Sequence, residues 1–357
     1  MSLIFAIIFA VLLFSLLIFV HEFGHFAAAK LSGVQVNEFS MFMGPAIAKW
    51  KRGTTQYTIR CIPIGGYCAM EGEEEDTDNP HSFQKAAWWK RLIILAAGSF
   101  MNFLTGVLIV AVVLFWQPNY VTTELTHVES WCSASVAGGL QAGDQILEFD
   151  GKKISIYEDF TLTTMLAPDG NYDITVLRDG QKVELKAVPM IRQLVADDSG
   201  AQSRLYGISF KPAKTTAASV PGRILPTALN YVKSVVVSLE MIFSGQAGLQ
   251  DMTGAVGIVQ IMSESAARAE DVSLALLNML YFGGFLAINL AVMNVLPIPA
   301  LDGGRIVGLL LTTGIEAVTR KKIDPKYEGY IHTVGMIALL VLMALITFKD
   351  IFTIFKR

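Results

Sequence analysis

Four long apolar blocks, separated by polar segments, dominate the sequence. They run from Ser2 to Val20, from Leu92 to Trp116, from Val272 to Leu301, and from about Ile331 to Phe348. A helix needs about 20 apolar residues to cross the hydrocarbon core of a bilayer. The pattern therefore predicts four transmembrane helices.

The first block differs from a signal peptide because it lacks a basic start. An Ala27-Ala28-Ala29 run follows it and resembles a cleavage site. Cleavage there would discard or isolate a polar group that follows the block, comprising His21, Glu22 and His25. We therefore expect the first block to be a retained anchor.

Lysine and arginine near the span ends predict the orientation. The Lys30–Arg91 loop is rich in both, and so is the loop that contains Arg305 and Arg320. Both loops are therefore expected in the cytosol, with residues 117–271 and both termini outside. Residues 224–243 are largely apolar but carry Lys233 and Glu240 on one helical face, which favours an interfacial helix over a fifth crossing.

Residues 121–212 have a different pattern. Tyr172, Ile174 and Val176 alternate with polar residues, a turn signal follows at residues 178–181, and alternation resumes at Val183. This pattern predicts a β-hairpin. Upstream, the expected order is a small-residue helix at residues 135–142, a Gly-Asp turn, a strand and an Asp-Gly turn. That order resembles a bacterial PDZ domain, which binds peptides by strand addition. The alternative is an α+β spacer that binds nothing.

Composition agrees with a membrane protein. The chain is 53% hydrophobic and 17% charged, against about 45–50% and about 25% in soluble domains. A net charge of -3 and the lack of a basic cluster argue against nucleic-acid binding. The three cysteines form no CxxC motif. The predicted topology leaves Cys132 without a partner on its side of the membrane, so no disulfide is expected.

The most informative motif is His21-Glu22-Phe23-Gly24-His25. On a helix, residues i and i+4 share one face, so both imidazoles can hold one zinc ion, with Glu22 beside them to move a proton. Three ionisable residues at the end of an apolar span are costly unless they are functional. The alternative is a polar helix end outside the bilayer.

A catalytic zinc usually has three protein ligands and one open position. Asp302 is the best third candidate because it ends the third block on the side where the first block ends. The following glycine pair allows a close backbone approach. Alone, such an Asp-Gly-Gly is more often a turn. The remaining histidines are expected at surfaces or interfaces: His81, His127 and His332.

Together these motifs resemble the site-2 protease family of intramembrane zinc metalloproteases, in its RseP-type bacterial branch. The resemblance also rests on residues 98–103 (GSFMNF), on the PDZ-like segment and on residues 294–304 (NVLPIPALDGG). It implies that Zn²⁺ is held by His21, His25 and Asp302, with Glu22 as catalytic acid and base.

The same resemblance implies further substrate-binding residues. Asn294 corresponds to the family asparagine that holds the substrate backbone. Asn102 corresponds to the asparagine of the GxxxN segment, for which helix packing is the alternative. Residues 53–70 resemble the membrane-associated hairpin, with Gly65, Gly66 and Tyr67 near its end. Its free edge would hold an unwound substrate as an added strand.

Departures from the family pattern are small. Ser99 and Ala255 stand where proline is common, and only one PDZ-like segment is present where some members have two. The acidic run at residues 71–76 is expected to be a solvated loop, with a gating role as the alternative.

The predicted fold class is a polytopic α-helical membrane protein with an inserted extracytoplasmic α+β PDZ-like domain and a membrane-associated β-hairpin. The first part of the membrane core is expected at residues 1–116, with spans at 2–25 and 91–116 and the hairpin at 34–70. The PDZ-like domain follows at 121–212 and interfacial helices at 222–270. The second part of the core is expected at 272–357, with spans at 272–298 and 331–350.

The predicted function is regulated intramembrane proteolysis in a bacterial inner membrane, with the active site near the cytosolic side. Expected substrates are single-span proteins after a first extracytoplasmic cut, either anti-sigma factors or remnant signal peptides. Expected partners are these substrates, the lipid bilayer, and peptide C-termini at the PDZ-like domain. Two alternatives are a catalytically silent peptide-binding scaffold, which the intact motifs oppose, and a zinc transporter, which needs polar residues across the bilayer.

Overall fold

The computed structural model describes residues 3–73, 77–136, 138–196, 202–248, 251–269, 271–320 and 326–355. The chain divides into two compact units. One comprises Met1–Val110 with Val235–Arg357, and the other comprises Ala111–Ser234. The predicted metal-site residues all belong to the first unit.

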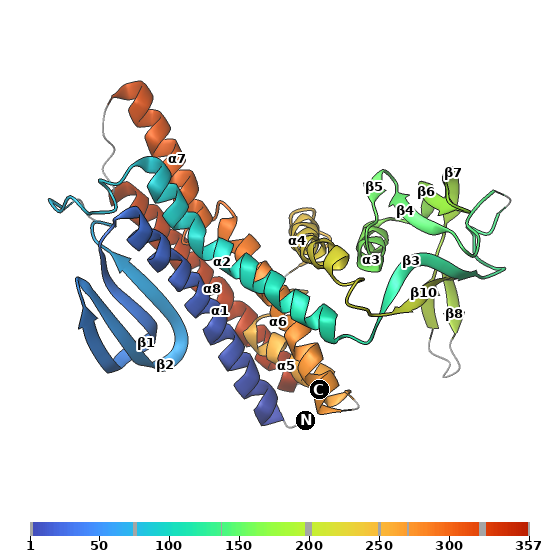
Figure 1. The fold of residues 1–357 in the computed structure, drawn as a ribbon, viewed down its shortest axis with the longest axis horizontal. Coiled ribbons are helices and arrows are strands. Elements are labelled where there is room, and N and C mark those ends of the chain that lie inside the picture. Colours follow the sequence, from blue (N-terminus) through green and yellow to red (C-terminus); the bar gives the residue numbers. More distant parts are fainter. Residues whose placement is uncertain are drawn as a thin grey trace. The chain divides into compact units, whose positions relative to one another are not determined.

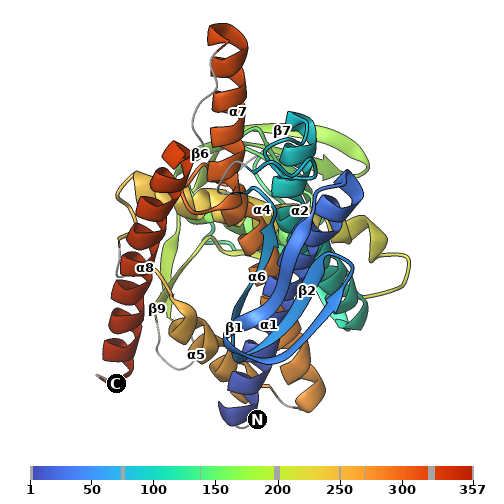
Figure 2. The same cartoon turned by 90° about the vertical axis from the view of Figure 1, so that its left-hand side faces the viewer.

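Within the described residues, four helices are long and apolar enough to cross a membrane, as predicted. They are α1 (Leu3–Ser32), α2 (Trp88–Trp116), α6 (Val272–Val295) and α8 (Lys326–Phe355). Figures 1 and 2 show α1 beside α6 in the first unit, whereas α8 stands apart from these two helices and contacts α5 (Ala255–Ala267) and α7 (Asp302–Thr319). Leu13 and Leu17 of α1 pack with Met279 and Ala287 of α6 in a buried core.

Two further helices contribute to the first unit. Helix α5 (Ala255–Ala267) inserts the fully buried Met262 into the core of α1 and α6. Its amino-terminal end is held by Asp350 of α8, whose Oδ2 accepts hydrogen bonds from the backbone N–H groups of Gly254 and Gly257 at 2.9 and 3.0 Å. A carboxylate at a helix amino terminus satisfies donors that the helix leaves unpaired.

The segment after the third apolar block differs from the expected loop. Helix α6 ends at Val295, and a second helix, α7 (Asp302–Thr319), follows a short turn. Pro297 and Pro299 stop α6 because they lack the backbone N–H that a continuing helix needs. Asp302 opens α7, where an acidic side chain is favourable. The candidate ligand is therefore fixed by the start of a helix.

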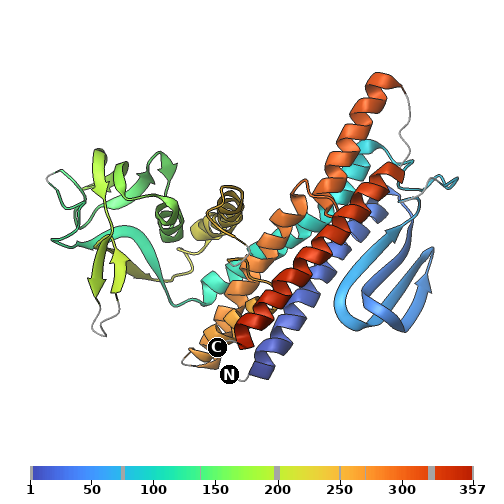
Figure 3. The same ribbon diagram turned by 180° about the vertical axis from the view of Figure 1, so that it is seen from behind.

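Strands β1 (Val36–Arg52) and β2 (Thr55–Met70) form an antiparallel hairpin that packs against α1 (Figures 2 and 3). Both strands bend, so residues 38–41 pair with residues 56–59 on one side and with residues 66–69 on the other. The segment at residues 66–69 is consequently an edge. In the described part of the chain, no other strand pairs with its far side.

The second unit contains a sheet with strand order β10-β3-β4-β6-β7, in which β5 pairs with β4. Its strands are β3 (Asn119–Val128), β4 (Gln145–Phe149), β5 (Lys152–Lys153), β6 (Gly170–Arg178), β7 (Gln181–Met190) and β10 (Ile208–Lys214). A separate hairpin joins β8 (Gln193–Ala196) to β9 (Gln202–Leu205). Helix α3 (Tyr157–Leu166) packs Phe160 into the core of this unit, and α4 (Pro221–Phe243) begins here.

The predicted hairpin at residues 172–187 is confirmed as β6 and β7, with Arg178 paired to Gln181. The predicted small-residue helix at residues 135–142 is wrong, since the described residues there form turns. Two glycines explain the difference. Gly138 has φ +81°, and a Cβ on Gly139 would lie 2.2 Å from the carbonyl oxygen of Ala134. Such a backbone favours turns over a helix.

Candidate metal centre

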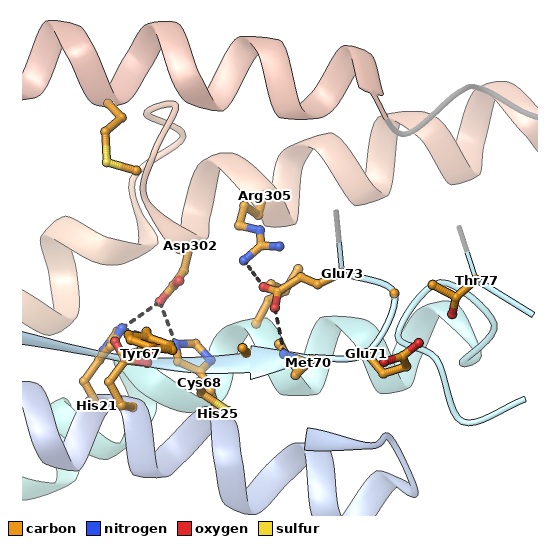
Figure 4. Close-up of a pocket in the computed structure, with 15 residues that line it drawn as sticks. His21, His25, Tyr67, Cys68, Met70, Glu71, Glu73, Thr77, Asp302 and Arg305 are labelled. Atoms are coloured by element: carbon orange, nitrogen blue, oxygen red, sulfur yellow. Dashed lines mark hydrogen bonds and ion pairs between the residues drawn. The ribbon is translucent and has the colours of Figure 1, made fainter. Parts of the chain in front are cut away.

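Three predicted ligands from two distant parts of the sequence meet in the first unit. His21 and His25 lie one turn apart on α1, with their Nε2 atoms 3.2 Å from each other. Oδ2 of Asp302, at the start of α7, lies 3.2 Å from Nε2 of His21 and 3.4 Å from Nε2 of His25. Figure 4 shows the three side chains pointing toward one another. The arrangement suits a single metal ion.

The carboxylate of Asp302 is the feature that calls for a cation. Its Oδ2 atom is buried and has no hydrogen-bond partner of adequate geometry, despite the two imidazoles beside it. Burial alone would raise the pKa of Asp302, but the imidazoles outweigh burial and hold that pKa below its usual range. An ionised, unsatisfied carboxylate beside two imidazole nitrogens fits the His and carboxylate ligand set of catalytic zinc.

The histidine rings are oriented by their other nitrogens. Nδ1 of His25 lies 2.8 Å from the carbonyl oxygen of Ile94 in α2. Donation to that carbonyl places the proton on Nδ1 and leaves Nε2 free to bind a metal. The carbonyl thus selects the tautomer that a metal requires.

Nδ1 of His21 faces two asparagines. The Nδ2 atoms of Asn102 and Asn294 lie 3.4 and 3.5 Å from it. Asn102 is 1% exposed, and its Oδ1 has no partner. A 180° rotation of that amide would let Oδ1 accept from Nδ1–H of His21, which again frees Nε2. Both asparagines expected from sequence therefore lie at the site, beside His21.

Gly98 of α2 makes room for the two histidines. A Cβ at this position would lie 2.3 Å from Nε2 of His25 and 2.7 Å from Cε1 of His21. Any larger residue would push the rings out of their places. The glycine of the GSFMNF segment therefore leaves the space that the two imidazole rings occupy. The sequence analysis did not predict this role.

The turn that carries Asp302 is fixed from α8. The backbone N–H of Ala300, a residue with φ +77°, donates a 3.0 Å hydrogen bond to Nδ1 of His332. Gly303 packs so closely against the end of α6 that a Cβ would lie 2.1 Å from the carbonyl oxygen of Val295. The sequence analysis expected His332 at a surface or interface. The structure places this partly exposed histidine against the turn that precedes the third candidate ligand.

Glu22 and the edge segment of β2 line one pocket of about 680 Å³ together with the three candidate ligands. A Cβ on Gly66 would lie 3.3 Å from Cγ of Glu22, so the edge strand passes directly beside this carboxyl. Gly65 has φ +80°, and Tyr67 lines the pocket. Burial raises the pKa of the neighbouring Cys68 thiol. Among the described residues, the ligand atoms that lie within 4.8 Å of one another are those of His21, His25 and Asp302.

Membrane-spanning helices and a site with two histidines and one carboxylate define the class of a membrane metalloprotease. Comparison with known proteins agrees. The model of Peptidase family M50 matches residues 9–342, so the chain belongs to this family of zinc-dependent intramembrane proteases.

Named relatives span nearly the whole chain. A Clostridium perfringens protein whose name assigns it to the zinc metalloproteases is 37% identical over 347 residues, covering 97% of this chain and 98% of its own. The zinc metalloprotease RasP of Shouchella clausii is 27% identical, covering 96% and 98%. The regulator of sigma-W protease RasP of Bacillus subtilis is 24% identical, covering 97% and 98%. The predicted metalloprotease activity and zinc dependence are thereby confirmed.

Proposed function

We propose that this protein cleaves peptide bonds within transmembrane segments of single-span membrane proteins after a first extracytoplasmic cut. The observation that carries the proposal is the meeting of His21, His25 and Asp302 beside Glu22 and an open strand edge. Peptide hydrolysis needs all three parts of this site. The ligands bind the metal ion, Glu22 accepts a proton, and the strand edge binds the substrate.

In this proposal His21, His25 and Asp302 hold zinc. When bound, zinc lowers the pKa of a water molecule to about 7 and polarises a carbonyl. Glu22 lies in the same pocket and takes the proton from the attacking water, then returns it to the leaving amine. The carbonyl of Ile94 keeps the imidazole of His25 in the tautomer that leaves Nε2 available.

The edge at residues 66–69 binds the substrate as an added strand. A peptide bond in a transmembrane helix is shielded by its own hydrogen bonds, so it must be unwound before hydrolysis. Strand addition supplies replacement hydrogen bonds. We assign this role to Gly65, Gly66 and Tyr67, and assign Asn294, which is partly accessible, to the substrate backbone. The burial of Asn102 favours the alternative of helix packing over substrate binding, and its position beside His21 lets it orient that ring as well.

The second unit is proposed to be an extracytoplasmic PDZ-like domain that excludes substrates with bulky uncut ectodomains and binds peptide C-termini. The active site then lies near the cytosolic side of a bacterial inner membrane, because the positively charged loops flank it. Anti-sigma factors and remnant signal peptides have the required single-span form. The name of the Bacillus subtilis relative, a regulator of sigma-W, supports the first of these substrate groups.

A glutamine at position 22 tests the proposal. Glu22→Gln should lower cleavage of a model single-span substrate by about 10²–10⁴-fold, since one general acid and base is removed. Zinc content, measured by atomic emission on the purified protein, should not change. Glu240→Gln, at an exposed position on α4, is the matched control and should cleave normally. Equal cleavage by Glu22→Gln and wild type would eliminate the proposed mechanism.

A further inference from the structure

A partly buried ion pair lines the same pocket as the candidate metal ligands. Oε1 of Glu73 lies 2.5 Å from Nη1 of Arg305, which stands one turn into α7. Oε2 of the same carboxylate accepts a 3.2 Å hydrogen bond from the backbone N–H of Met70 (Figure 4). The Glu73 side chain is only 15% exposed. The acidic run was expected to be solvated, and for Glu73 that expectation is wrong. Residues 74–76 lie outside the described residues.

The N–H of Met70 lies on the open side of the edge strand, as the hydrogen bonds of its neighbour show. The next N–H, that of Glu71, donates to the carbonyl oxygen of Gln35, on the side of β1. Successive groups along a strand point to opposite sides. The N–H of Met70 therefore points to the open side, where an added strand would otherwise pair with it. Glu73 supplies the acceptor that a substrate carbonyl would supply there.

The ion pair with Arg305 holds the Glu73 carboxylate against the N–H of Met70. It belongs to the same helix as Asp302, three residues further along, and both line the pocket. Because the ion pair is mostly shielded from water, it is screened less than a surface pair. The helix that presents the candidate ligand Asp302 also holds the blocking carboxylate, so the distance between the two is set by one rigid element.

We propose that Glu73 is a specificity-determining end stop that limits the substrate strand to the edge at residues 66–69 and thereby sets which bond faces the metal. This proposal rests on the proposed function. It assigns Glu73 no part in bond breaking. Its role is to occupy the last edge donor, so that the bound segment has one register.

Glu73→Ala should release the N–H of Met70 and let the substrate advance along the edge. A slip of two residues keeps every substrate side chain on the same face, whereas a slip of one reverses them. Glu73→Ala should therefore give a second product displaced by two residues from the wild-type cleavage site. One additional backbone hydrogen bond is worth about 0.5–1.5 kcal/mol, so KM should fall by about 2- to 10-fold.

Two variants separate the acceptor from the charge. Glu73→Gln keeps an oxygen that can accept from Met70, so it should retain the single wild-type product. Glu71→Ala is the matched control, because Glu71 lines the same pocket but accepts its hydrogen bond from Asn37. It should also cleave at the wild-type position.

The experiment uses the full-length protein in detergent with a model single-span substrate, and products are mapped by mass spectrometry alongside zinc content. A displaced second product in Glu73→Ala, absent in Glu73→Gln and Glu71→Ala, supports the end stop. A single wild-type product in Glu73→Ala overturns it, and so does loss of zinc, which would make Glu73 a structural anchor. Cleavage by Glu22→Gln in the same assay would instead refute the proposed function.

Discussion

Two aspartates with buried carboxylate oxygens, one in each unit, have opposite surroundings. Asp144 of the second unit is 1% exposed and is surrounded by donors. Arg178 binds it through Nε and Nη2 at 2.7 and 2.8 Å, and the N–H of Gln141 donates at 2.9 Å. Asp302 of the first unit has imidazole nitrogens within 3.4 Å, yet its Oδ2 has no hydrogen bond.

The difference separates a structural carboxylate from a functional one. A buried charge is costly unless it is paired and hydrogen-bonded. At Asp144 the fold meets this requirement itself, so the residue contributes to stability. At Asp302 the requirement is left open, and a metal cation would satisfy it. A buried carboxylate oxygen without a hydrogen-bond partner thus indicates a site where a cation can bind.

Asp302→Asn should produce the largest effect on zinc affinity, and it tests the contrast between Asp302 and Asp144. Binding energies of about 10–16 kcal/mol in four-ligand zinc sites imply that one ligand contributes about 3 kcal/mol, or roughly 10²-fold in affinity. Zinc affinity, measured by chelator competition, should fall by that factor or more, and cleavage with it. Thermal unfolding of the metal-free protein should hardly change. A large loss of metal-free stability would mean that Asp302 is structural like Asp144.

Asp144→Asn should show the reverse behaviour. Removing one partner of a buried ion pair costs about 3–5 kcal/mol, because Arg178 then loses its counter-charge. Partial exposure of the Arg178 side chain, at 22%, places the effect near the lower end. Amide hydrogen exchange in residues 119–214 should accelerate, while zinc affinity stays at the wild-type value. Reduced zinc affinity here would remove the distinction between the two carboxylates.

Gly98→Ala tests whether the histidine pair depends on the space that α2 leaves. The added methyl would overlap Nε2 of His25, and disturbing the orientation of a ligand typically costs about 10–100-fold in metal affinity. Gly314→Ala on α7 is the control, since a Cβ there would meet no atom within 4 Å. Equal zinc affinity in both variants would show that the space at Gly98 does not control zinc binding.

His332→Leu should have the smallest effect. It removes the acceptor for the N–H of Ala300 and leaves the turn before Asp302 less restrained. One neutral hydrogen bond is worth about 1 kcal/mol, so zinc should dissociate roughly fivefold faster, as followed by transfer to a fluorescent chelator. His332→Asn keeps an acceptor oxygen and should restore part of the wild-type rate. Identical rates in all three proteins would exclude this role.

Some predictions needed only local sequence. The four spans follow from apolar length, and the His21–His25 pair follows from helical spacing, because both depend on residues close together in the chain. The turn of the β6–β7 hairpin was likewise readable, since Asp179 and Gly180 both have positive φ. The small-residue helix at 135–142 failed because alanine and serine fit helices and turns alike, and two glycines decided the outcome.

Local sequence patterns were enough to predict the membrane character, the two histidines on one helical face and a carboxylate that could join them. The folded chain was needed to see that Gly98 and the carbonyl of Ile94 arrange the imidazole rings, that His332 holds the turn before Asp302, and that Glu73 accepts from the edge of β2. These contacts could not be predicted because the groups that make them come from separate elements. Periodicity records which residues share a face of one element. In contrast, the contacts of His25 with Ile94, of Ala300 with His332 and of Glu73 with Arg305 join residues 69, 32 and 232 positions apart, and no local pattern encodes them.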